Sequence, residues 1–76
     1  PLGHLAYQRA DGTPVARCSF PAGPDDRPVS MGAAQGMELA RWNTPGLGYI
    51  LIGGQEQAPL QSEAEAFQSW SVGDTI

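Results

Sequence analysis

Glycine and proline divide this chain into short apolar runs, and this spacing constrains the fold more than any other feature. The ten glycines and seven prolines cluster between the apolar runs. The longest apolar run, 47–52, is itself interrupted by a glycine, whereas a membrane-spanning helix needs roughly 20 apolar residues. Because clustered glycine and proline mark turns, the pattern favours short strands over a helical bundle.

Two strands joined by a tight turn are predicted near the N-terminus. A short apolar element covers residues 4–8, and Asp11-Gly12 follows it. Asp-Gly between such runs is a strong hairpin signal, because glycine adopts positive φ without strain. The next strand is expected over 14–20, where alternation gives an apolar face and a second face. The apolar face holds Ala16, Cys18 and Phe20, and the second holds Val15, Arg17 and Ser19.

The middle of the chain is predicted to form a loop and two further strands. Residues 21–35 mix Pro, Gly, Asp and Ala, and we expect a 15-residue loop there, far longer than the usual connection of about 4–6 residues. Strands are expected over 37–42 and 47–52, with a Pro-Gly turn over 43–46. Since 47–52 is apolar on both faces, it is predicted to be a central strand or one covered on both sides.

A C-terminal helix is predicted over 59–70. Pro59 suits the first helical position, where its missing N–H costs nothing. Leu60, Ala64 and Phe67 recur at helical spacing and form an apolar stripe, which we expect to pack on the sheet. The chain is therefore predicted to be an α+β domain: a small antiparallel sheet of about four strands with a C-terminal helix packed on one face.

Length and composition predict one domain. Compact domains typically run to about 100–150 residues, and this chain has 76, of which 41% are hydrophobic and 16% charged. Residues 1–3 resemble the remnant of a cleaved affinity tag, 4–72 are predicted to form the domain, and 73–76 to form a tail. We see no signal peptide, so the targeting segment of an exported protein would lie upstream.

Charge and residue types argue against nucleic acid, metal and cofactor as ligands. Four basic residues against eight acidic ones give a net charge of −4, and lysine is absent, whereas a nucleic-acid binder normally carries a basic face. Cys18 and His4 supply two soft ligands where structural zinc takes four. The glycine runs at 46–48 and 53–54 match no phosphate-binding spacing. We therefore expect no cofactor, no metal and no nucleic acid.

Candidate catalytic residues are few, and each has a structural interpretation that we prefer. A Cys18–His4 pair requires the two strands to be neighbours, and a minimal hydrolase using Cys18 is the weakest alternative. A free cysteine among apolar residues usually behaves as a small hydrophobe, so we interpret Cys18 as packed. Asp25 and Asp26 are interpreted as solvated turn residues of the long loop. We predict that the chain is not an enzyme.

Acidic and aromatic residues of the second half are likewise given structural roles. Glu63 and Glu65 suit the N-terminal half of a helix, and residues two apart on a helix do not face each other. Trp70 lies off the apolar stripe and is the candidate for a partner interface. The other large aromatic residues are predicted to be core: Trp42, Tyr49 and Phe67.

One ordered series of residues spans nearly the whole chain. It comprises Tyr7, Asp11-Gly12, Val15 to Phe20, a strand ending in Trp42, the segment from Gly46 to Gly53 (Gly-Leu-Gly-Tyr-Ile-Leu-Ile-Gly), Leu60 and Ala64-Glu65-Ala66. This series resembles the C-terminal region of membrane-anchored anti-sigma factors, the transmembrane regulators of extracytoplasmic-function sigma factors. In that family a strand ending in tryptophan precedes a glycine-x-glycine-tyrosine strand and a helix rich in Leu and Ala.

The resemblance implies a protein of three parts. A cytoplasmic N-terminal domain holds the sigma factor, a single transmembrane helix follows, and a periplasmic sensor domain, to which this chain corresponds, lies outside. The zinc motif of the sigma-binding part is absent here, so the sigma factor is a partner only of the missing N-terminal domain. The implied partners of this chain are an envelope signal protein or a regulatory protease, and an unpaired sheet edge would promote a homodimer.

The implied mechanism is regulatory. An envelope signal changes the conformation or contacts of the domain, exposes the anti-sigma factor to proteolysis, and frees the sigma factor. The Pro21–Gln35 segment is our hypothesis for the responsive surface. The alternative function is a cytoplasmic protein-interaction module that binds a partner through a sheet edge, which the acidic charge, the missing lysine and the single cysteine fit equally well.

Overall fold

The computed structural model describes residues 3–74, with the side-chain surroundings of residues 3–69. This part of the chain forms five strands followed by one helix. In chain order they are β1 (Gly3–Gln8), β2 (Pro14–Pro21), β3 (Arg27–Ala34), β4 (Met37–Thr44), β5 (Leu47–Ile52) and α1 (Gln57–Asp74). The predicted α+β class is confirmed, with five strands where about four were expected.

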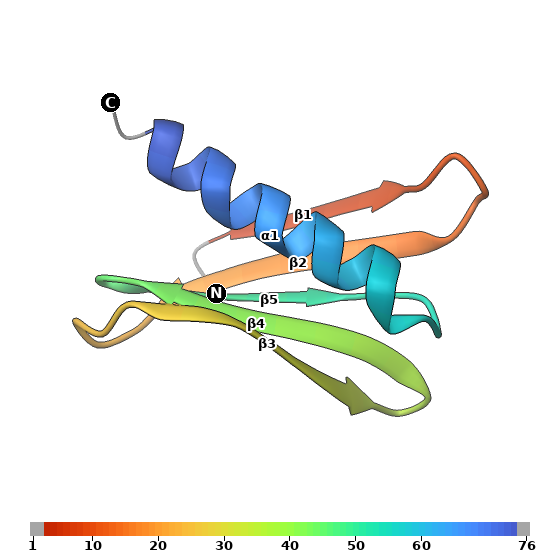
Figure 1. Cartoon of the computed structure of the whole chain (residues 1–76), viewed down its shortest axis with the longest axis horizontal. Coiled ribbons are helices and arrows are strands. Elements are labelled where there is room, and N and C mark those ends of the chain that lie inside the picture. Colours follow the sequence, from red (N-terminus) through yellow and green to blue (C-terminus); the bar gives the residue numbers. More distant parts are fainter. Residues whose placement is uncertain (1–2, 75–76) are drawn as a thin grey trace.

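The five strands form one antiparallel sheet in the order β1-β2-β5-β4-β3 (Figure 1). β1 and β2 are one hairpin, β3, β4 and β5 form a meander, and β5 returns to pair with β2. β5 is therefore the central strand, the first of the two alternatives that its apolar faces left open. β1 and β3 are the two edges of the sheet.

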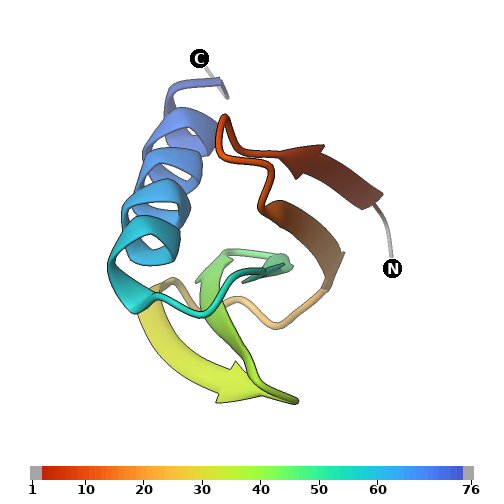
Figure 2. The same cartoon turned by 90° about the vertical axis from the view of Figure 1, so that its right-hand side faces the viewer.

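The helix lies across one side of this sheet, which curves around it (Figure 2). The predicted apolar stripe is confirmed, because Leu60 and Ala64 are fully buried and Phe67 packs at the margin of the core. The helix is longer than predicted and begins at Gln57, so Pro59 is not its first residue. Pro59 still lies in the first turn, where backbone N–H groups have no intrahelical partner and its missing N–H costs no hydrogen bond. Within residues 3–74, no helix combines the length and apolar character needed to cross a membrane.

The predicted loop over 21–35 is wrong, because most of it is an edge strand. Residues 27–34 form β3, and the connection between β2 and β3 is 22–26 alone. Pro28 and Gly32 weaken the strand signal, yet Val29 and Met31 pack against the core from this strand. An edge position tolerates proline, since one side of the strand makes no ladder hydrogen bonds. Tertiary packing therefore overrides the local loop signal.

Aromatic side chains line the space between sheet and helix. Trp42 is buried, and its ring stacks on Tyr49 with the centroids 5.2 Å apart. This confirms that Trp42 belongs to the core, whereas Tyr49 and Phe67 are half-buried at its margin. Trp70 lies in α1, and its side chain is outside the described residues.

The ends of the predicted domain fall differently from expectation. Gly3, assigned to the tag remnant, pairs with Ser19 as the first residue of β1. The tail predicted over 73–76 overlaps the last turn of α1, which ends at Asp74. Residues 1–2 and 75–76 lie outside the described part of the chain.

Candidate functional site

One face of the sheet carries no helix, and we call it the open face. Strand alternation and register place it opposite Val15, Trp42 and Leu51, which point into the core. Its central side chains are Ala16, Cys18, Phe20, Ile50, Ile52, Leu39 and Arg41. The prediction separated the two faces of β2 correctly. However, the helix covers the Val15 face, and the more apolar Ala16–Cys18–Phe20 face is open and half-buried.

The open face changes from apolar to polar towards one corner. Arg41 lies beside Ile50 and opposite Ser30, and the next pair along the same strands is Asn43 and Arg27. These four polar residues occupy two neighbouring strands, β3 and β4. Side chains directly opposite each other on antiparallel strands are about 4.5–5.5 Å apart at Cβ. The register therefore groups two arginines, a serine and an asparagine in one corner.

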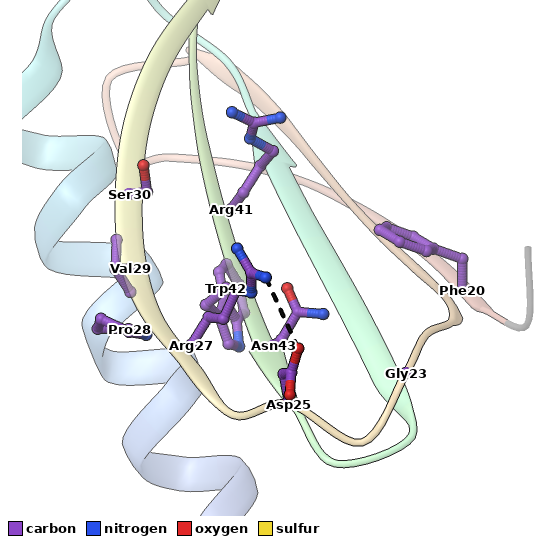
Figure 3. A pocket seen from close by; sticks show the side chains of 10 residues that line it. All are labelled: Phe20, Gly23, Asp25, Arg27, Pro28, Val29, Ser30, Arg41, Trp42 and Asn43. Atoms are coloured by element: carbon purple, nitrogen blue, oxygen red, sulfur yellow. Dashed lines mark ion pairs between the residues drawn. The ribbon is translucent and has the colours of Figure 1, made fainter.

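A hollow of about 690 Å³ lies at this corner, which we call the corner hollow (Figure 3). Arg27, Asn43 and Asp25 bring their polar ends together, while Phe20 stands on the opposite side. Across the adjacent strand the Phe20 ring lies over Gly48, where an added Cβ would come 2.5 Å from ring atom Cε2. The missing side chain at position 48 thus makes room for an aromatic wall.

The wall formed by the 22–26 connection is held in place by backbone hydrogen bonds. The Ala22 N–H donates to the Gly46 carbonyl at 3.1 Å, and the Gly46 N–H donates to the Gly23 carbonyl at 3.0 Å. Asp25 and Asp26 are exposed in this connection, in agreement with their interpretation as solvated turn residues. Asp25 pairs with Arg27 at 3.7 Å, and both side chains are about 70% exposed, so the pair contributes little.

On the helix side, long side chains join the β1–β2 hairpin to α1. Arg9 donates from Nε to Glu63 Oε2 at 2.8 Å and from Nη2 to Oε1 at 2.6 Å. Tyr7 and Phe67 have ring centroids 6.1 Å apart, and the Arg17 guanidinium lies 5.1 Å from the Phe67 centroid. We call these five residues the hairpin–helix contact. Bidentate geometry and partial burial make its ion pair stronger than an exposed one.

The hairpin–helix contact also shifts the pKa values of its members. Burial raises the pKa of the Tyr7 phenol above its ordinary value, and the negative charge of Glu63 raises it further. The hydrogen bonds to Glu63 raise the pKa of Arg9, so the guanidinium stays charged. Nearby, the backbone N–H of Thr13 donates to Asp11 and lowers the pKa of that carboxyl. The hairpin–helix contact therefore stabilises the charged form of Arg9 and the neutral form of Tyr7.

The register brings together His4 and Cys18, the candidate catalytic pair considered from the sequence. His4 and Cys18 are directly opposite each other on β1 and β2 and share the open face. Among the described residues no hydrogen bond joins them, and no group of three or more metal-ligating side chains occurs. Glu65 is exposed on α1, whereas Glu63 turns towards Arg9. The glycine run at 46–48 overlaps the start of β5, and the run at 53–54 follows its end.

Two features of the site were missed from the sequence. The Arg9–Glu63 pair joins residues 54 positions apart, and no local signal reports such a contact. The corner hollow forms only because β3 pairs with β4. The sequence analysis assigned β3 to a loop, so this pairing was not predicted. A period-two apolar pattern at Val29 and Met31 was the one available signal for that strand.

The chain was also compared with known proteins. No family model, curated protein or solved structure matches it.

Proposed function

We propose that this chain is a non-enzymatic regulatory domain, the periplasmic sensor of a membrane-anchored anti-sigma factor that controls an extracytoplasmic-function sigma factor. Its partner in this proposal is an envelope signal protein or a regulatory protease. The sigma factor is bound by a separate N-terminal domain on the other side of the membrane.

The observation that carries this proposal is the packing of the residues on which the resemblance rests. Trp42 stacks on Tyr49 at an interplanar angle of 10°. Leu60 and Ala64 from the helix are fully buried in the same cluster, and Tyr7 packs against its margin. Residues that are far apart in the sequence therefore form one structural unit. This supports treating the ordered series as a folding pattern shared with that family.

The hairpin–helix contact supplies a means of signalling. Apart from the buried Val15, the hairpin reaches the helix through side chains rather than through close backbone packing. A partner that competes for Phe67 or Glu63 would separate the hairpin from α1 and leave the rest of the core intact. In the proposed function this movement exposes the anti-sigma factor to proteolysis. Our hypothesis for the signal-receiving surface remains the 21–35 segment. In the structure this segment comprises mainly the 22–26 connection and the edge strand β3.

The first experiment is a topology test on the full-length protein. A reporter that is active only outside the cytoplasm is fused after Ile76. Activity supports the exported sensor. No activity from a stably produced fusion excludes it and leaves the cytoplasmic interaction module.

The signal-receiving surface is tested separately in cells. Replacing 22–26 with a flexible linker of equal length changes the surface and leaves the strands in place. We expect the sigma-dependent response to the envelope signal to be lost. Unchanged signalling would remove this segment from the proposal.

The alternative function, an interaction module that uses a sheet edge, is favoured by the character of β1. This strand is an edge, it contains no proline, and Leu5 on it is 41% exposed. The other edge, β3, carries Pro28 and a register shift between Arg27 and Ser30, features that hinder edge pairing. The homodimer that the resemblance implies would use the same edge, so it is compatible with either function. Leu5→Lys would then convert dimer to monomer in light scattering, and a monomeric parent chain would exclude the homodimer.

A further inference from the structure

The cationic residues of this domain are divided unevenly between its two sides. The chain has four arginines and no lysine against eight acidic residues. Arg9 is bound by Glu63, and Arg17 lies over the Phe67 ring. Arg27 and Arg41 both line the corner hollow. Half of the positive charge of an acidic domain is therefore gathered at one hollow on the open face.

Within residues 3–69, neither of these two guanidinium groups has an ion pair or hydrogen bond of good geometry. Arg27 meets Asp25 at 3.7 Å with both side chains exposed, which is too long for a good hydrogen bond. Arg41 forms no ion pair within residues 3–69. Each guanidinium offers five N–H donors in a planar fork that matches a carboxylate or a phosphate. The hollow thus presents more donor capacity than its own acceptors use.

The remaining polar residues at the hollow are also able to donate. Ser30 lies opposite Arg41, and Asn43 lies opposite Arg27, so the four side chains form a two-by-two array on β3 and β4. A hydroxyl and an amide supply further donors beside the guanidinium groups. The acceptor that competes with an incoming anion is Asp25, which is weakly paired and exposed. The chemistry of the array is that of an anion site.

The opposite wall of the hollow is aromatic. The Phe20 ring lies over Gly48 and stands across the hollow from Arg27, Asn43 and Asp25 (Figure 3). Ile50 continues the apolar surface next to Arg41. We propose that the corner hollow binds a small organic oxyanion, a carboxylate or phosphate attached to a flat apolar group. The oxyanion lies between Arg27 and Arg41, displaces Asp25, and the apolar group packs against Phe20.

This ligand site is independent of the side of the membrane on which the domain lies. It therefore goes beyond the proposed function, and its failure would leave that function standing. Binding at the hollow would change the surroundings of the 22–26 connection, because Gly23 and Asp25 of that connection line the hollow.

The test is a titration of the 76-residue chain, followed through its backbone amide signals by nuclear magnetic resonance. The probes are benzoate, phenyl phosphate and inorganic phosphate. We expect saturable shifts confined to β3, β4 and 22–26. Binding of either aromatic probe supports the site, and comparing benzoate with phenyl phosphate shows which oxyanion it prefers.

Four variants separate this site from general charge attraction. Arg41→Gln removes a charge-assisted donor and should lower the affinity for phenyl phosphate by about tenfold or more. Arg17→Gln makes the same change in net charge on the helix side and should leave binding unchanged. Asp25→Asn removes the competing acceptor and should strengthen binding. Phe20→Leu should abolish the advantage of phenyl phosphate over inorganic phosphate.

Two results would overturn the proposal. One is the absence of saturable shifts with all three probes. The other is an equal loss of affinity in Arg41→Gln and Arg17→Gln, which would show attraction to net charge alone. The amide spectrum of each variant reports whether it is folded, and Arg41 is exposed, so its replacement leaves the core untouched. If Arg41→Gln nevertheless unfolds, Arg41→Lys keeps the charge, removes the bidentate fork, and should still weaken binding.

Discussion

The helix is held to the two halves of the sheet in different ways. The backbones of β3, β4 and β5 lie close to α1, and buried side chains such as Ala40 and Leu60 fill the space between. The β1–β2 hairpin lies further from α1, and beyond Val15 it is attached by the hairpin–helix contact. Dense apolar packing opens as one unit, whereas a few long side chains separate at lower cost. We infer from this difference that the hairpin can separate from α1 without unfolding the core.

The largest effect is expected in the closely packed half. Leu60→Ala removes a fully buried side chain and should lower the free energy of unfolding by about 2–5 kcal/mol. Both halves should then lose structure together in urea, because the hairpin depends on the helix. Urea denaturation followed by fluorescence and circular dichroism measures this. A hairpin that melted separately at higher urea would contradict the comparison.

A smaller effect is expected from breaking the hairpin–helix contact. Glu63→Gln removes the charged acceptor of Arg9, whose side chain is 15% exposed, and should cost about 1–2 kcal/mol. Because the loss is local, hydrogen exchange should accelerate most in β1 and in the β2 amides that pair with it, and change little in β3 and β4. Glu65→Gln on the exposed side of α1 is the matched control. Uniform acceleration across the sheet would show that the two halves are not separable.

Two of the glycine turns offer a matched pair, one in each half of the sheet. Gly12 and Gly46 both have φ of 89° and empty space where a Cβ would lie. Alanine at either position adopts this left-handed backbone with a strain of about 1 kcal/mol. Gly46→Ala should lower the global free energy of unfolding, whereas Gly12→Ala should mainly accelerate hydrogen exchange in the hairpin. If the two variants changed the free energy of unfolding and the hydrogen exchange equally, the two halves of the sheet would not differ in their attachment to the helix.

The pH dependence gives the smallest effect. Burial and the charge of Glu63 raise the pKa of Tyr7, so the stability contributed by its neutral form is complete below the ordinary value of about 10. It is lost as the pH rises through the raised pKa. Urea denaturation at pH values below and above this range should show a fall in the free energy of unfolding. The Tyr7→Phe variant should not show this fall. In an ultraviolet titration, Glu63→Gln should lower the pKa of Tyr7. An unchanged pKa in this variant would mean that Glu63 does not act on the phenol.

Local signals predicted most of the elements but not their pairing. The Asp11-Gly12 hairpin, the apolar character of both faces of β5 and the Leu60–Ala64 stripe were all found, because each depends on residues close in sequence. β3 was missed because its proline and glycine are typical of a loop. Its apolar residues are buried only through tertiary packing against the core. For the same reason the corner hollow was missed, because no local signal groups Arg27 with Arg41.

The sequence by itself determined the turns at Asp11-Gly12 and Pro45-Gly46, the apolar character of both faces of β5, and which side of the helix is apolar. These follow from backbone preferences and from side-chain periodicity. Only the tertiary structure decided which face of β2 the helix covers, since a period of two separates the faces without saying which is buried. It also decided the pairing of Arg9 with Glu63 and the grouping of Arg27 with Arg41. Such contacts depend on register and on the curvature of the sheet, which no local stretch of residues contains.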